Sequence, residues 1–218
     1  MNLRASVRWV MGAAFLVVVA GLVAADNDRN TVTTRLSGLE ETTATIQTPA
    51  SGEFKATISE DGTSIKYEET WRNLSSTVTQ SHIHFGRPGL SGGIVLWLCY
   101  NPNPPANTKA PTGVPTPQLC PTDTIATISG TLTEADLIPS VAAPAGGQGV
   151  DAGAQGFAEM VKAIRTGSAY VNVHSVDHPS GEIRGRLPGF FPRFPPRPGN
   201  DRRDDRHDDH HDDGGHQH

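Results

Sequence analysis

The sequence predicts an all-β domain, an antiparallel Greek-key sandwich or barrel with one or two short helices in its loops. Three observations support this class. Apolar and polar residues alternate in short runs, turn-forming residues (23 Gly and 17 Pro among 218) separate these runs, and only two short stretches have helical character. The length suits a single core of ordinary size.

The first 25 residues have the three-part pattern of a cleavable signal peptide. Arg4 and Arg8 precede an apolar run that ends at Val23, and small side chains lead to a cleavage point before Asp26. A retained anchor is the alternative, but the run is shorter than the roughly 20 residues that span a bilayer. We therefore expect a secreted or periplasmic protein with no transmembrane segment after cleavage.

Net charge argues against one class of partner. Cleavage removes two arginines and no acidic residue, which lowers the formal charge from −5 to −7. Nucleic-acid binding depends on Lys and Arg side chains that neutralise phosphates. We therefore expect no nucleic-acid partner.

The β domain is expected over residues 35–187, after a polar lead-in over 26–34. Alternation over 53–58, the turn pair Asp61-Gly62 and renewed alternation over 65–72 predict a half-buried antiparallel hairpin.

Later segments continue the β pattern. The continuous apolar run over 94–100 predicts a central strand buried on both faces, and 124–133 predicts another strand. One helical turn is expected over 133–137, and apolar spacings of three and four predict an amphipathic helix over 157–164 that ends at Gly167. Residues 169–174 and 182–187 read as the last two strands.

The composition changes after Leu187. Residues 188–200 are rich in Pro and are expected to form an extended linker. Residues 201–218 are almost entirely Asp, His, Arg and Gly, so they cannot bury enough apolar surface to offset the entropy of ordering and are expected to be disordered.

The chain has two cysteines, Cys99 and Cys120. In an exported protein the simplest expectation for an isolated pair is a disulfide bond, here closing a Pro- and Asn-rich loop. Two unpaired thiols are the alternative. Two cysteines alone are too few for a structural zinc site.

Two motifs carry a family resemblance. One is Ser-His-Ile-His-Phe-Gly over 81–86, and the other is Tyr-Val-Asn-Val-His over 170–174 followed by Gly-Glu-Ile-Arg-Gly over 181–185. Together with Leu-Ser-Gly over 36–38, they make residues 35–187 resemble the CHRD domain, the module repeated in chordin and found singly in bacterial exported proteins. The resemblance implies an extracytoplasmic β domain and implies no catalytic activity.

Side-chain alternation suggests a candidate metal site. His82 and His84 share one face of their strand, and His174 shares a face with Tyr170 and Asn172. If these strands are neighbours, the three imidazoles meet, supported by a polar set that comprises Tyr170, Asn172, Glu182 and Arg184. Imidazole suits copper and zinc. The alternative is a structural role, in which the histidines hydrogen-bond Arg184, Glu182 and backbone.

The first motif also resembles the copper-binding strand of copper/zinc superoxide dismutase. The likeness ends there, because the stretch after Gly86 has no histidine that could bridge two metals, and no His/Asp-rich zinc loop lies between Cys99 and Gly130. Superoxide-dismutase-like redox activity is therefore only the minor alternative.

The tail offers a second, weaker metal-binding candidate. Its histidines lie among aspartates, a composition that can hold divalent ions without fixed geometry; they are His207, His210, His211, His216 and His218. A solubilising tail is the alternative.

The function favoured by the sequence is an exported, non-catalytic binding or structural module, monomeric, with an unidentified extracytoplasmic protein or surface component as partner. A copper or zinc protein using the three-histidine site is the first alternative. Metal buffering by the tail is the second.

Overall fold

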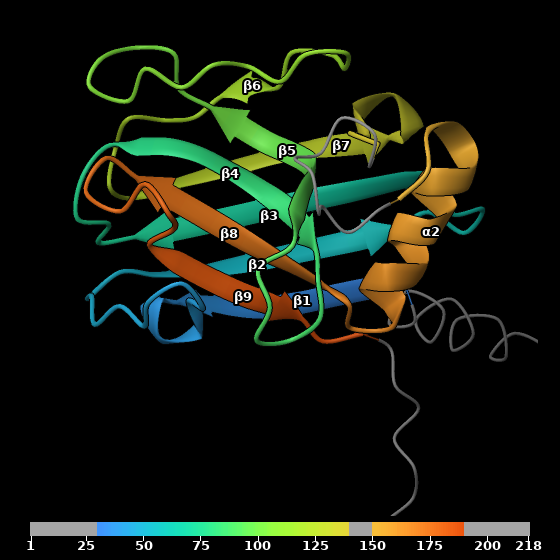
Figure 1. Ribbon diagram of the computed structural model, residues 1–218, viewed down its shortest axis with the longest axis horizontal. Helices are drawn as coiled ribbons and strands as arrows, with labels where there is room; N and C mark the ends of the chain where they lie inside the picture. Colours follow the sequence, from blue (N-terminus) through green and yellow to red (C-terminus); the bar gives the residue numbers. More distant parts are fainter. Residues whose placement is uncertain (1–29, 140–149, 190–218) are drawn as a thin grey trace, which may run out of the picture.

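The computed structural model describes residues 30–139 and 150–189, and their strands form one curled sheet (Figure 1). In chain order the strands are β1 (Thr31–Ser37), β2 (Ser51–Ile58), β3 (Ser64–Arg72), β4 (Val78–Phe85), β5 (Gly93–Tyr100), β6 (Gln118–Leu119), β7 (Ala126–Thr133), β8 (Ala169–Ser175) and β9 (Ile183–Leu187). Their order across the sheet is β6-β5-β4-β8-β9-β1-β2-β3-β7. All neighbouring pairs are antiparallel except β5 and β6, which run parallel.

The sheet folds over on itself into two layers. In Figure 1, β9, β8, β4 and β5 lie in front of β1, β2, β3 and β7. The layers join at β9 and β1, where a single residue pair, Ser37 with Arg184, continues the ladder. Hydrogen bonds tie the layers together at the far side: the Tyr67 hydroxyl donates to the Leu98 carbonyl across 3.0 Å. The predicted all-β class with short helices is confirmed.

The predicted hairpin is β2 and β3. Its alternation puts Phe54, Ile58 and Ile65 inside, each at most 1% exposed, and the turn between the strands uses Gly62 at φ +71°. Positive φ costs glycine little because it has no Cβ.

The structure changes one predicted boundary and the predicted place of one strand. β1 begins at Thr31, so the strand includes the last four residues of the segment expected as a lead-in, because Val32 already points into the core at 2% exposure. β5 is not the central strand that its apolar run predicted, since it lies between β4 and the two-residue β6. Its inward side chains Leu96 and Leu98 are buried, whereas Trp97 is half-buried on the outer face.

Helical segments cover the ends of the strands. The short 3-10 helix η1 (Gly38–Glu40) follows β1, and η2 (Glu134–Asp136) follows β7, where the Thr133 amide donates to Asp136 Oδ2 across 2.8 Å. The predicted amphipathic helix is α2 (Gly153–Arg165), which stands across one end of the layers (Figure 1). Its buried residues are the four that the spacing identified, Phe157, Met160, Val161 and Ile164, together with the small residues Gly156 and Ala163.

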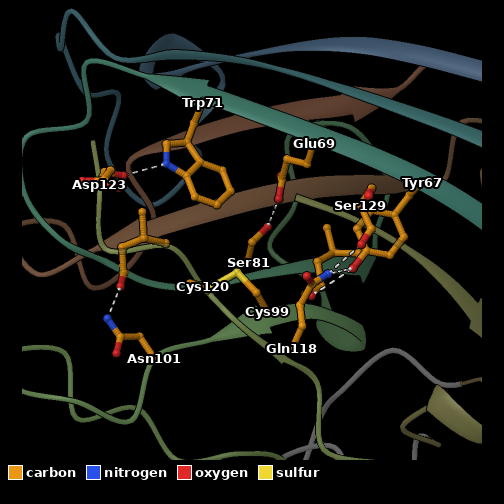
Figure 2. Close-up of a disulfide and its surroundings, with 12 residues drawn as sticks. Tyr67, Glu69, Trp71, Ser81, Cys99, Asn101, Gln118, Cys120, Asp123 and Ser129 are labelled. Carbon is orange, nitrogen blue, oxygen red and sulfur yellow. Dashed lines mark hydrogen bonds between the residues drawn. A yellow bond between two sulfur atoms is a disulfide. The ribbon is translucent and has the colours of Figure 1, made fainter. Parts of the chain in front are cut away.

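Cys99 and Cys120 form a disulfide bond, as predicted (Figure 2). The bond holds the start of the chain after β6 against β5, and the Cys120 amide also donates to the Tyr100 carbonyl. Beside it, the Gln118 amide donates to the Tyr67 hydroxyl at 2.7 Å and to the Ser129 carbonyl at 3.0 Å. The Gln118 side chain therefore links the two outer edges of the curled sheet.

Three predictions concern residues outside the described ranges: the signal peptide over 1–25, nearly all of the linker over 188–200, and the Asp/His tail over 201–218. Among the described residues, no helix is long and apolar enough to cross a membrane.

Candidate metal centre

The sheet brings the three predicted histidines together. β4 and β8 are antiparallel neighbours, with His82 opposite Asn172 and His84 opposite Tyr170. Since alternate residues share a face, the outward side of β4 presents His82 and His84 next to the outward side of β8, which presents Tyr170, Asn172 and His174. The neighbouring strands that the metal hypothesis required are therefore present.

β-bulges shape the partner strand on the other side of β4. The β4–β5 register shifts twice, between Ser81 and His82 and between Ile83 and His84. A bulge bends its strand and redirects side chains. Here the register sets Trp97 opposite His82, and their rings meet edge to face with centroids 4.9 Å apart. Trp97 thus covers one side of the cluster.

The imidazoles are in contact. The ring centroid of His82 lies 4.8 Å from that of His84 and 4.6 Å from that of His174. One nitrogen of each ring lies within 4.8 Å of a nitrogen of both others. All three residues are buried, at 0%, 8% and 7% exposure in sequence order.

Backbone carbonyls orient two of the rings. His84 Nδ1 lies 2.9 Å from the Gly92 carbonyl oxygen, and His174 Nδ1 lies 2.9 Å from that of Pro179. A carbonyl only accepts, so each Nδ1 carries the proton and each Nε2 is left with a free lone pair. Outer hydrogen bonds of this kind orient a histidine as a metal ligand, although the lone pair of His84 Nε2 is already used by the 2.9 Å contact with His82 Nδ1.

A proton count shows that the cluster lacks hydrogen-bond donors. Three neutral imidazoles carry three N–H protons; two bind the carbonyls of Gly92 and Pro179, and the third occupies the 2.9 Å contact between His82 Nδ1 and His84 Nε2. No proton remains for the Nε2 atoms of His82 and His174. Both atoms are buried and have no hydrogen-bond partner among the described residues.

The surroundings keep the imidazoles neutral. Burial lowers the pKa of His84 to about 3 and the pKa of His174 to about 4. Burial, followed by the neighbouring His174 and His84, holds the pKa of His82 well below its ordinary value. The neutral ring is the form that binds metals.

An aromatic stack supports His84. Its ring lies parallel to that of Tyr170, with centroids 4.5 Å apart and planes 6° apart, and the Arg184 Cζ lies 3.4 Å from the Tyr170 centroid. The Tyr170 hydroxyl accepts a hydrogen bond from the Gly92 amide at 3.0 Å. Tyr170 therefore holds both the ring of His84 and the loop that binds its Nδ1.

The rest of the predicted polar set lies on the same part of the sheet, but its hydrogen bonds go to loops. Asn172 Nδ2 donates to Glu41, and the Glu182 carboxylate accepts from Ser75 and Thr48. The structural alternative gave the histidines Arg184, Glu182 and backbone as partners. Its backbone part is confirmed, because His84 and His174 bind the carbonyls of Gly92 and Pro179. The third contact among the described residues joins His82 to His84, and it involves neither Arg184 nor Glu182.

Several contributors had no separate sequence signal. Gly92 and Pro179 act through backbone oxygen, which residue identity does not predict. Glu41 reaches Asn172 from the loop after η1, and burial raises its pKa to about 7 against the lowering effects of the Asn172 hydrogen bond and of Arg184. Trp97 was hidden in an apolar run. The tail histidines lie outside the described residues.

Comparison with known families identifies the domain. A family model for the CHRD domain matches residues 32–187. The chain belongs to the CHRD family. Its match begins at the second residue of β1 and ends at the last residue of β9, so it covers the whole curled sheet. Searches of curated proteins and of solved structures find no match. The CHRD family supports a binding or structural role in an extracellular type of domain, and the disulfide agrees with that setting.

Proposed function

We propose that this CHRD protein is a metal-binding module that holds one copper or zinc ion between His82, His84 and His174. The observation that carries the proposal is the pair of buried, unpartnered Nε2 lone pairs on His82 and His174. Leaving a buried acceptor unsatisfied costs about 1–3 kcal/mol for each group. A metal ion would use both lone pairs, and three imidazoles are a ligand set that suits zinc and copper.

The donor set determines how an ion would be held. His84 and His174 would bind through Nε2, because their Nδ1 atoms are engaged with carbonyls. Bonds of about 2.1 Å in tetrahedral geometry need nitrogens about 3.4 Å apart. The three candidate ligand nitrogens lie within 4.8 Å of one another, so the rings would move closer together to hold an ion. The 2.9 Å contact between His82 Nδ1 and His84 Nε2 would then be lost.

The non-catalytic role rests on burial alone. The three ligands are at most 8% exposed, which would shield an ion from solvent, whereas three protein ligands leave the fourth tetrahedral position of that ion free. We further propose that the chain is exported by residues 1–25. Amino-terminal sequencing of the secreted protein should then begin at Asp26, and a retained first residue would contradict export by cleavage.

Metal content tests the site. Full-length mature protein is dialysed against a weak chelator and analysed for all first-row metals. We expect one copper or zinc per chain in the wild type and near zero in His84→Ala. His178→Ala is the matched control, because His178 lies in the neighbouring loop outside the cluster, and it should keep the metal. Circular dichroism establishes that each variant is folded.

A tail variant separates the site from the tail. Here the five tail histidines are replaced by Asn. Metal that survives this change but not His84→Ala supports the three-histidine site. Metal that disappears with the tail histidines assigns binding to the tail. Wild-type protein that retains no metal after reconstitution with either ion contradicts both sites and supports a binding or structural module without a metal.

A further inference from the structure

A small cavity lies on the outer face of the front layer, where β8 and β9 meet the loop after β4. Its volume is about 40 Å³. The side chains around it include three guanidinium groups, one carboxylate and one phenol: Arg87, Arg184, Arg186, Glu40 and Tyr170. Three positive charges against one negative charge make the cavity electropositive.

Local sequence explains how the three arginines converge. Arg184 and Arg186 are two residues apart on β9, so they project from the same face. Arg87 comes from the turn Arg-Pro-Gly-Leu, in which the Leu90 amide donates to the Arg87 carbonyl at 3.1 Å and Gly89 has φ +75°. Proline followed by a glycine of positive φ is typical of a type II turn. The turn directs Arg87 back over the strand.

Arg184 is the buried member of the group, at 5% exposure. Its two described hydrogen bonds go to neutral acceptors, the Thr42 hydroxyl at 2.7 Å and the Leu90 carbonyl at 2.8 Å. A guanidinium has five N–H donors, so three are left without an acceptor among the described residues. Its flat face is occupied by the Tyr170 ring.

The counter-charge around Arg184 is incomplete. A buried charge is costly unless it is paired. No carboxylate of the described residues accepts a hydrogen bond from Arg184. Glu41, whose pKa Arg184 lowers, accepts its hydrogen bond from Asn172. The two other arginines are exposed, and Arg186 makes only a 3.4 Å contact with the Gly167 carbonyl. The cavity is therefore lined by a positive charge that no hydrogen-bonded carboxylate of the described residues neutralises.

We propose that this cavity binds a small monovalent anion, a halide or a planar oxyanion such as nitrate or bicarbonate. The anion accepts hydrogen bonds from Arg184 at the base and from Arg87 and Arg186 at the rim. A cavity of 40 Å³ exceeds the roughly 10–15 Å³ needed for one water molecule, but it is too small for a sugar acid. The site does not depend on a metal ion, since none of its groups is a proposed ligand.

Thermal unfolding of the metal-free, full mature chain tests the proposal. Bromide, chloride or nitrate replaces gluconate at constant ionic strength. The solutions then differ only in whether the anion is small enough to enter the cavity. A ligand that binds the folded state alone raises the midpoint in a saturable way. We expect saturation by these small anions in the wild type and no added effect of gluconate.

A charge-matched pair of variants locates the site. Arg87→Gln with Arg186→Gln should weaken binding about tenfold or more, since hydrogen bonds to charged groups contribute about 1.5–3 kcal/mol each and 1.4 kcal/mol is tenfold. Lys66→Gln with Arg72→Gln removes the same charge from exposed positions of β3 and should leave binding unchanged. Equal weakening in both pairs, or a midpoint that rises without saturation, overturns the proposal.

Anomalous diffraction from bromide-soaked crystals gives a second measurement that needs no variant. A bromide peak within hydrogen-bonding distance of Arg184 supports the site. A cavity without bromide, in crystals that hold it elsewhere, overturns the proposal whether or not the metal site is occupied.

Discussion

Two buried polar clusters lie on opposite faces of β4, and they begin at adjacent residues. The Ser81 side chain points between the layers, where its hydroxyl donates to Glu69 Oε2 at 2.7 Å (Figure 2). The His82 side chain points outward into the imidazole cluster. Both clusters are fully buried at these positions, and both contain polar atoms without a hydrogen-bond partner in the part of the chain that the structure describes: Glu69 Oε1 inside, and two imidazole Nε2 atoms outside.

The clusters differ in how the free-energy cost of burying their polar groups can be lowered. A carboxylate can take up a proton, and burial raises the pKa of Glu69 to about 8, against the lowering effect of the Ser81 hydrogen bond. Glu69 is therefore neutral at pH 7 without any ligand. The imidazoles are already neutral, and their unpartnered atoms are lone pairs that need an electrophile. Protonation thus removes the buried charge of Glu69, although its Oε1 still has no partner among the described residues. The lone pairs of the imidazoles can be used only by an electrophile such as a metal ion.

The largest expected effect is the loss of stability when rising pH deprotonates Glu69 in the inner cluster. The folded-state pKa of Glu69, about 8, lies above the ordinary value of 4.5. The unfolded chain therefore loses its proton first, so the stabilisation is complete below about pH 4.5 and disappears as pH rises through 8. Linkage gives Glu69 alone a loss of roughly 4 kcal/mol in the free energy of unfolding between about pH 5 and pH 8. The three imidazoles, whose pKa values are lowered, give the opposite slope below about pH 6.5.

The variant Glu69→Gln should abolish that decline while keeping an acceptor for Ser81. Urea unfolding of the metal-free protein at several pH values measures it. Glu41, with a pKa raised to about 7, contributes to the decline below pH 7, so the interval from 7 to 8 is diagnostic for Glu69. A wild-type decline in that interval that persists in Glu69→Gln would contradict the assignment.

The next prediction tests whether the metal site depends on the disulfide bond, which is called the brace below. Replacing both Cys99 and Cys120 by Ser opens a link between residues 21 apart in sequence, which should lower the free energy of unfolding by about 3 kcal/mol in the chain-entropy model. Metal content should stay the same, because the brace joins β5 to the chain after β6, whereas the proposed ligands lie on β4 and β8. Loss of metal from the folded variant would show that the two are coupled.

Alternation made part of this contrast predictable. It placed His82, His84 and His174 on common faces, and it also placed Glu69 in line with the apolar residues Tyr67 and Trp71. Glu69 was nevertheless missed, because a carboxylate is almost never fully buried, so the strand pattern and the residue type disagreed. The pattern was the better guide.

The pairing of β4 with β8 and the loop contacts of the histidines could not be predicted from the sequence. Alternation could state only that the imidazoles meet if β4 and β8 pair, since register between distant strands depends on the whole sheet. The carbonyls of Gly92 and Pro179, which fix the tautomers, are backbone groups that every residue type offers. The apolar run of β5 suggested a second buried face, whereas its Trp97 instead packs on His82.

The smallest expected effect is a change in metal affinity when one supporting side chain of the outer cluster is altered. Tyr170→Phe keeps the ring that stacks on His84 and removes the hydroxyl that accepts from the Gly92 amide. An unsatisfied amide costs about 1 kcal/mol, and the carbonyl of the same residue orients His84. Loss of such an outer hydrogen bond typically weakens metal binding 10- to 100-fold, so we expect about tenfold weaker binding in a chelator competition assay.

Tyr100→Phe is the control for that experiment, because Tyr100 is a half-buried residue of β5 at the far end from His84. It should bind the metal as the wild type does. If Tyr170→Phe also binds like the wild type, the Gly92 carbonyl holds His84 without help from the phenol, and the orientation of this ligand comes from the β4–β5 turn alone. If it binds more weakly, while stability falls only by the cost of one amide, then Tyr170 acts on the metal through the backbone of Gly92, and the outer cluster extends one residue beyond its ligands.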